Sequence, residues 1–437
     1  MRNQYALARE VQKVIIRMQE HENTGDLLRR QPESLARVIC VSRRIPVLTP
    51  GREDVFRFLW SHDIPVVVTG VQAHLKGLWS PAAFVETHGE DFLTMITVAR
   101  QGSSTRKATV REFFQEFTQD DDTRGRVVKV KDWPPSTSFS DSFKPYCEAF
   151  MDAVPMPSYT RNDGYRNLAA HYPEPTDKRP TFKPDLGPKM YIATKDIDEC
   201  GSTPLHLDAT CAVNILVHEE PTSSTSEQGG AYWEVYARED TPKLRKYLRE
   251  SGYSVSGDPI HSRSIYITRA MRDNLKEIGV VPYEIHQRYG QAVFIPAGCA
   301  HQVSNLGACI KIATDFLCVE GILASIAISK EFQAEAEEGL LSLDAMLWHV
   351  WASISRQLRL LPLEEPPVLS KKQKKRKGRK EALRAIGDSG GRETKRSRRE
   401  PNAIGPTPSS EPSFTCPEPD CRKTTRVYGL DGVLCHL

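Results

Sequence analysis

The sequence predicts a mainly β domain with flanking helices. Short β-rich runs recur along the middle of the chain, separated by turn and helical segments. They lie at 65–70, 127–131, 189–194, 212–217, 231–236, 291–296 and 309–316. Several short strands with turn signals between them are typical of a β-sandwich or barrel.

Helical patterns flank these strands on both sides. Residues 1–44 contain apolar side chains at near-helical spacing, which predicts an N-terminal amphipathic helix. These side chains are Tyr5, Leu7, Val11, Val14, Ile15 and Met18. Residues 322–358 carry a second helical pattern, and its apolar positions are expected to pack against the strands. A homodimer contact is the alternative for that helical segment.

Three residues form a candidate metal site. His206 and Asp208 stand two apart in GSTPLHLD (201–208), where β-type sequence points both side chains to one face. His301 follows an apolar strand pattern and a turn that can present it. Two imidazoles and one carboxylate leave three positions of Fe(II) open for a bidentate co-substrate and dioxygen. The set predicts an oxygenase; a His301 that is buried and only hydrogen-bonded is the alternative.

The H-x-[DE] spacing alone is not specific. With 12 His and 56 acidic residues, it should arise by chance roughly once or twice. His88 and Glu90 have this spacing after a Ser-Pro helix start, so both are expected in solvent. His218 and Glu220 end an apolar run and enter a polar stretch, so they are expected in a loop between strands.

Several further segments follow one another in fixed order from roughly residue 45 to 356. They read PVVVTG (65–70), KDWPP (131–135), YTR (159–161) with DG (163–164), PDLGPKMY (184–191), LHLD (205–208), Trp233, DPIH (258–261), FIPAG (294–298) with HQV (301–303), and CIKIA (309–313) with DF (315–316). Together they resemble the JmjC-domain lysine demethylases, and most of all the branch that acts on mono- and dimethylated lysine 9 of histone H3. The resemblance implies a double-stranded β-helix, a jelly-roll of two antiparallel sheets with iron inside its mouth.

The resemblance also implies 2-oxoglutarate as the co-substrate. A buried carboxylate needs a cation with hydrogen-bond donors, and Lys311 is the expected one. In CIKIATDF (309–316), alternation separates Lys311 from the isoleucines, although an edge-strand lysine that discourages aggregation is the alternative. By resemblance, Thr203 would donate its hydroxyl to the same carboxylate and Asn214 would lie near the co-substrate. Many JmjC proteins carry their lysine just before the tryptophan that corresponds to Trp233; this chain has none there, which favours Lys311.

The activity implied by the resemblance is that of a 2-oxoglutarate-dependent dioxygenase, a histone lysine demethylase that hydroxylates N-methyl groups and releases formaldehyde. Its partner would be the histone H3 tail or the nucleosome. A JmjC hydroxylase acting on a non-histone side chain and a catalytically weak chromatin scaffold are the alternatives. An intact triad argues against the scaffold. No protein general base is expected, because metal and co-substrate carry the chemistry.

The chain changes character after residue 360. Residues 361–413 are rich in Pro, Ser, Gly and charge, which predicts a disordered linker. Basic blocks at 371–380 and 395–399 are typical of a nuclear localisation signal, with nonspecific, salt-sensitive DNA contact. A solvated tail without a function is the alternative. The catalytic domain with its flanking helices is accordingly expected over 45–360.

Residues 414–437 resemble an incomplete zinc finger. They contain Cys416, Cys421, Cys435 and His436. The spacing is loose and two of the ligands are adjacent, so a degenerate finger is expected and structural zinc is the alternative. Proteins of the resembled branch usually carry a zinc module before the barrel, whereas residues 1–44 contain only Cys40.

The composition of the chain indicates the cellular compartment in which the protein is expected. The 437 residues carry a net charge of +3 and ten mostly scattered cysteines, which suits a reducing environment better than a disulfide framework. The chain has no apolar run of membrane-spanning length and no secretory leader pattern. These features predict a soluble intracellular protein without a membrane partner, and the basic blocks predict the nucleus.

Overall fold

The computed structural model describes residues 39–40, 42–75, 79–99, 102–119, 125–173, 184–197, 201–220, 229–252, 257–335 and 343–360. The chain divides into two units, one up to Met346 and one from Leu347. The fold described below is that of the first unit, apart from the helix α13 Leu343–Leu360, most of whose residues belong to the second. The expected N-terminal helix, the basic linker and the Cys/His tail lie outside the described residues, apart from the last residues of the 1–44 segment.

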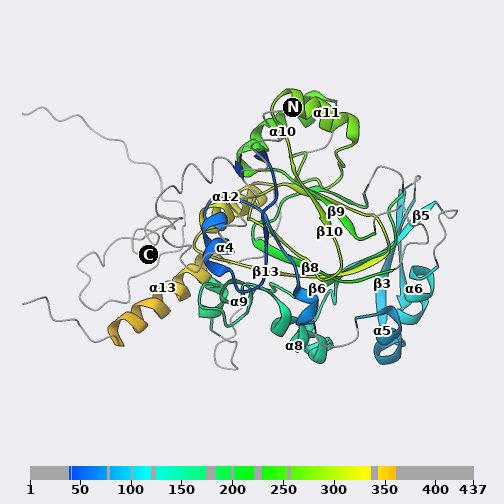
Figure 1. The fold of residues 1–437 in the computed structure, drawn as a ribbon, viewed down its shortest axis with the longest axis horizontal. Coiled ribbons are helices and arrows are strands. Elements are labelled where there is room, and N and C mark those ends of the chain that lie inside the picture. Colours follow the sequence, from blue (N-terminus) through cyan, green and yellow to red (C-terminus); the bar gives the residue numbers. More distant parts are fainter. Residues whose placement is uncertain are drawn as a thin grey trace, which may run out of the picture. The chain divides into compact units, whose positions relative to one another are not determined.

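A nine-stranded sheet is the larger of two sheets in the first unit (Figure 1). Its strands are β1 Val47–Leu48, β2 Val66–Val68, β3 Phe92–Ala99, β4 Gly102–Thr109, β5 Arg126–Trp133, β6 Lys189–Ala193, β8 Cys211–Glu219, β11 Ala292–Ile295 and β13 Cys309–Phe316. They lie side by side in the order β1-β2-β11-β8-β13-β6-β5-β3-β4. Neighbours are antiparallel except for the parallel pair β1 and β2.

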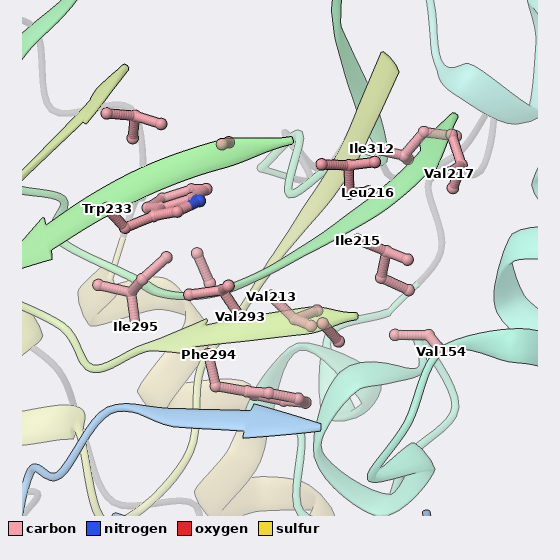
Figure 2. Packing of buried hydrophobic residues seen from close by; sticks show 14 of the residues in the cluster. Val154, Val213, Ile215, Leu216, Val217, Trp233, Val293, Phe294, Ile295 and Ile312 are labelled. Carbon is pink, nitrogen blue, oxygen red and sulfur yellow. The ribbon is translucent and has the colours of Figure 1, made fainter. Parts of the chain in front are cut away.

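The smaller sheet has four antiparallel strands. They are β7 Thr203–His206, β9 Ala231–Val235, β10 Tyr283–Gln287 and β12 His301–Asn305, in the order β10-β9-β12-β7. Figure 2 shows Trp233 of β9 turned toward Val293 and Ile295 of β11. All three side chains belong to one buried cluster, so the two sheets share a core.

Aromatic packing covers the outer face of the larger sheet. Phe294 projects from β11 on the side opposite Val293 (Figure 2). The helix α4 Glu53–Trp60 places Phe56 with its ring centroid 4.8 Å from that of Phe294, and Trp60 lies 5.7 Å from Phe316 of β13. Because successive residues of a strand point to opposite faces, this outer packing leaves the alternate positions of β11 and β13 to face the smaller sheet.

Local sequence sets where two of the other helices begin. Ser80 caps α5 by accepting a hydrogen bond from the Ala83 amide, ahead of a proline in the first turn. Thr109 and Glu112 form a reciprocal capping box at the start of α6. The remaining bounds are α5 Pro81–His88, α6 Val110–Phe117, α7 Phe139–Ser142, α8 Lys144–Ala153, α9 Pro157–Thr160, α10 Thr241–Glu250, α11 Arg269–Glu277, α12 Ile322–Ala334, α13 Leu343–Leu360, η1 Val71–Ala73, η3 Leu168–His171 and η4 Arg238–Asp240.

Each of the seven β-rich runs overlaps an observed strand, and the helical pattern over 322–358 covers α12 and all but the last two residues of α13. The fold is mixed α/β with two sheets, so helices form a larger part of the first unit than a mainly β chain would have. Among the described residues, no helix has the length and hydropathy needed to cross a bilayer.

Candidate metal centre

The smaller sheet brings the three predicted metal ligands together. His206 ends β7, His301 begins β12, and the two residues are partners across the antiparallel strand pair. Asp208 follows two residues after His206. Its backbone carbonyl accepts a hydrogen bond from the Gly298 N–H at 2.9 Å. One ligand atom from each of the three side chains lies within 4.8 Å of the others. That separation suits three ligands on one side of a single ion.

Hydrogen bonds orient both imidazoles. His206 Nδ1 lies 2.8 Å from the carbonyl oxygen of Pro204, and His301 Nδ1 lies 3.0 Å from that of Cys299. A carbonyl can only accept, so each Nδ1 carries the proton and each Nε2 keeps a free lone pair. His301 Nε2 lies 3.7 Å from Asp208 Oδ2. This donor set fits a divalent metal such as iron.

Burial and neighbouring charges shift the pKa values of two residues of the triad, His301 and Asp208. Desolvation lowers the pKa of His301 to about 4, and the neighbouring His206 ring adds to this effect while Asp208 opposes it. Desolvation acts to raise the pKa of Asp208, but the two imidazoles and Arg263 outweigh it and lower that pKa. A neutral imidazole and an ionised carboxylate are the forms that bind metal.

Lys311 and Asn214 share the inner face of the larger sheet. Asn214 is the cross-strand partner of Ala313, which stands two residues from Lys311 on β13 and therefore on the same face. Lys311 is only 6% exposed. Its Nζ lies 6.0 Å from the centroid of the Trp233 ring, and that ring lies 6.1 Å from the His301 ring. One indole therefore neighbours both the expected cation and the metal ligands.

A buried amide joins Asn214 to the smaller sheet. Gln287 at the end of β10 donates from Nε2 to the carbonyl of Asn214 at 3.0 Å and accepts from Trp233 Nε1 at 2.8 Å. Thr203 opens β7 and pairs with Val303, so it lies on the strand that also carries His206. The structure thus places Thr203 at the start of the strand that ends at His206, and Asn214 with Lys311 on the facing sheet.

The two other H-x-[DE] pairs have structural partners. His88 ends α5 and its Nδ1 lies 2.9 Å from Asp91, while Glu90 bonds Arg111 at 2.9 Å and is 83% exposed. His218 lies within β8 rather than in a loop, which corrects the expectation, because its strand continues through Glu219 to pair with β13. Its Nε2 lies 3.0 Å from Glu220.

Three polar residues near Lys311 were not expected from sequence. Asn305 accepts a hydrogen bond from Lys311 Nζ at 2.5 Å, and Asp196 accepts one from the Asn305 amide. Lys129 of β5 donates to the carbonyl of Ser202. Desolvation lowers the pKa of Lys129, with Lys311 adding to the effect and Asp196 opposing it. The spacing of His301 and Asn305, four apart on one strand, was the available signal for Asn305.

Carboxylates lie beside the site on the larger sheet. Tyr191 is the β6 partner of Lys311 and donates from its hydroxyl to Asp132 Oδ1 at 2.8 Å. Desolvation and the charges of Asp208 and Asp132 together raise the pKa of Asp315 to about 7. The surroundings of the triad therefore carry negative charge beyond its own carboxylate.

Two β-sheets with a site of two histidines and one carboxylate between them are typical of metal-dependent oxygenases. Comparison with known proteins agrees with this class. Residues 202–316 match the JmjC domain, described as a hydroxylase. The chain is therefore a JmjC-domain protein, as the sequence motifs predicted.

Individual relatives are lysine demethylases by name. The chain is 34% identical over 342 residues to lysine-specific demethylase 3A of Homo sapiens, an alignment that covers 68% of this chain and 25% of that protein. It is 35% identical over 344 residues to the same demethylase of Gallus gallus, covering 68% and 25%. It is 30% identical over 355 residues to lysine-specific demethylase JMJ29 of Arabidopsis thaliana, covering 64% and 40%. The chain spans about a quarter of the length of the 3A relatives.

Proposed function

We propose that this chain is an Fe(II)- and 2-oxoglutarate-dependent dioxygenase that removes methyl groups from histone lysine, with mono- and dimethylated lysine 9 of histone H3 as the substrate. The observation that carries the proposal is the convergence of His206, Asp208 and His301 on one sheet, opposite a buried Lys311 on the other. We infer that the two sheets form the double-stranded β-helix of JmjC domains. The similarity to lysine demethylases supports the reaction class.

The protein's own groups would bind and orient the reactants. The carbonyls of Pro204 and Cys299 hold the two Nδ1 protons, which directs both Nε2 atoms to the metal. Lys311 would donate to the distal carboxylate of 2-oxoglutarate, with Thr203 and Asn214 as further contacts. When bound, iron and 2-oxoglutarate supply the oxidation, in which dioxygen and the oxo acid give succinate and carbon dioxide and the hydroxylated methyl group leaves as formaldehyde.

A cationic substrate suits the charge around the triad. Asp132 and Asp315 lie on the larger sheet beside the site. Neither is among the three proposed metal ligands. The charge of Asp132 is therefore available to a methylammonium group, and Asp315, with a pKa of about 7, is ionised in part at neutral pH. This favours a methylated lysine over a neutral side chain as the target.

Incubation of methylated peptides tests the proposal. Purified protein with Fe(II) and 2-oxoglutarate should remove methyl groups from histone H3 peptides mono- or dimethylated at lysine 9, as measured by mass spectrometry, and should release formaldehyde. Addition of one oxygen atom to unmethylated peptides would instead indicate a hydroxylase. Absence of any turnover by metal-loaded, folded protein would indicate a scaffold.

Nuclear location and binding to the nucleosome belong to the same proposal. The basic blocks at 371–380 and 395–399 support both, and they would contact DNA nonspecifically. A homodimer through the helical segment over 322–358 and structural zinc in 414–437 stay predictions from sequence.

A further inference from the structure

A buried polar chain runs from Asp196 through Asn305 to Lys311. Asn305 is 4% exposed, Lys311 6% and Asp196 8%. Asn305 ends β12 of the smaller sheet, and Lys311 lies on β13 of the larger sheet, so the chain crosses between the two sheets. Polar groups placed so deeply cost free energy unless they are fully paired, which points to a role beyond packing.

Three hydrogen bonds join Asp196 to Asn305. The backbone N–H of Asp196 donates to the Asn305 carbonyl at 2.9 Å. In return, Asp196 Oδ2 accepts from the Asn305 backbone N–H at 2.7 Å and from its side-chain Nδ2 at 3.4 Å. These bonds hold both the backbone and the side chain of Asn305.

The partners on either side decide which way the Asn305 amide points. An ammonium can only donate, and Oδ2 of Asp196 already accepts from a backbone N–H. The amide nitrogen therefore faces Asp196, and Oδ1 faces Lys311 Nζ at 2.5 Å, with Cys309 Sγ at 3.4 Å. Swapping the amide would set a donor against the ammonium.

The Lys311 ammonium has three hydrogens, and Asn305 Oδ1 and the Cys309 thiol are its acceptors, so one hydrogen is left for a further acceptor. A lysine has a flexible four-carbon stem, and fixing it in advance removes the cost of ordering it on binding. We propose that Asp196 and Asn305 are positioning residues, which hold the Lys311 ammonium in the orientation that receives the distal carboxylate of 2-oxoglutarate. This inference rests on the proposed function, because it takes Lys311 as the co-substrate anchor.

Charge supports the same assignment. Lys129 and Lys311 both interact with the Asp196 carboxylate. Desolvation raises the pKa of Asp196, and the charge of Lys311 lowers it. Asp132 and Lys131 also act on Lys129, whereas Asp196 is the carboxylate that acts on both Lys129 and Lys311. Lys311 thus shares its nearest carboxylate with a second lysine, and a buried carboxylate of a ligand would add a counter-charge of its own.

Calorimetry of co-substrate binding tests the positioning role. The full chain is loaded with Mn(II), which occupies the site without turnover, and titrated with 2-oxoglutarate. Asn305→Ala and Asp196→Ala should each raise the dissociation constant roughly tenfold or more, as expected for a lost hydrogen bond to a charged group. Mn(II) stoichiometry should be unchanged, because neither residue is a ligand.

A double substitution separates positioning from general stability. In Lys311→Ala, Asn305 has no ammonium left to hold, so adding Asn305→Ala should weaken 2-oxoglutarate binding little further. Gln302→Ala is the matched control, since Gln302 is a buried amide on the same strand that bonds Ile267 on the opposite face. It should lower the melting temperature and leave 2-oxoglutarate affinity near wild type.

Each outcome has a distinct meaning. Additive effects of Asn305→Ala and Lys311→Ala, or an Asn305→Ala affinity equal to that of Gln302→Ala, would overturn the positioning role. A normal affinity in Asp196→Ala alone would remove Asp196 from it. If the wild-type protein does not bind 2-oxoglutarate, or if Lys311→Ala binds it normally, the proposed function itself fails.

Discussion

Asp208 supplies the negative charge of the candidate triad. We expect Asp208→Ala to abolish demethylation and to weaken iron binding by more than the roughly 10–100-fold typical of losing an outer partner of a metal ligand. The fold should persist, because the Asp208 side chain is 34% exposed and lies at the edge of the core. Bound iron per chain and peptide turnover are the measurements.

The chain contains a matched control for Asp208. Glu90 has the same spacing from a histidine, but its side chain is 83% exposed and bonds Arg111. Glu90→Ala should bind iron and turn over peptide as the wild type does. Full activity in Asp208→Ala would contradict the metal assignment.

Lys311 is the residue whose loss should act on the co-substrate alone. Lys311→Ala leaves a buried carboxylate without its counter-charge, a loss on the order of 2–5 kcal/mol. The apparent KM for 2-oxoglutarate should therefore rise steeply, while the iron content stays near that of the wild type. Lys107→Ala, which removes an exposed strand lysine over the Phe92 ring, should leave this KM unchanged. An unchanged KM in Lys311→Ala would move the anchor to another residue.

Residues that act through motifs could be predicted from sequence, and residues that act across the core could not. His206, Asp208 and His301 were expected because the sequence pattern put two of them on one strand face and the third after a turn, although β7 ends at His206 and Asp208 lies beyond it. Asn305 lies four residues after His301 and six before Lys311, so only its spacing on the strand hinted at a role. Asp196 acquires its role from a contact with Asn305, 109 residues away, and no local pattern encodes such a contact.

At the scale of elements, the approach of β7 to β12 sets the distance between the two histidines. Gly201 lies just before β7, and a Cβ there would stand 2.3 Å from the Val303 carbonyl oxygen and 2.6 Å from the Tyr266 ring. Gly201→Ala must therefore push the two strands apart. We expect it to lower both the melting temperature and the iron content of the purified protein.

A second glycine provides the control for Gly201. Gly51 has a φ of 86° and nothing within 4 Å of its Cβ position. Gly51→Ala should cost about 1 kcal/mol through backbone strain alone and leave the iron content unchanged. Equal iron loss in both variants would show that strand separation is not the cause.

Strands that sequence did not predict have identifiable physical features. All but the last two residues of β4 are exposed, so no apolar alternation marks them, and pairing with β3 supplies the backbone hydrogen bonds. The strand β7 has only four residues and contains a proline. By contrast, β10 alternates buried and exposed side chains, a signal that was present in Tyr283–Gln287.

At the scale of the whole molecule, the basic blocks at 371–399 are expected to direct location and encounter. They lie beyond the catalytic domain and contain no histidine or cysteine. Replacing their lysines and arginines by glutamine keeps the length and removes the charge. The tagged protein should then disperse from the nucleus, and nucleosome binding should weaken and lose its salt dependence.

Turnover of short methylated peptides is the internal control for that change. It should stay close to that of the unchanged protein, because exposed charges act over about a Debye length, roughly 8 Å at physiological salt. A collapse of peptide turnover, or undisturbed nuclear accumulation, would show that the blocks have another role.

The pairing of His206 with His301 across adjacent strands also bears on metal selection. Backbone hydrogen bonds between β7 and β12 hold the two rings near each other, and this pairing does not depend on an ion. Two ligands held by strand pairing cannot select one metal over another by folding around it. Cobalt, nickel and zinc bind nitrogen and oxygen ligands at least as strongly as ferrous iron. The identity of the occupant would thus depend on which metal the surroundings supply, and loading with a competing ion would silence the protein without unfolding it.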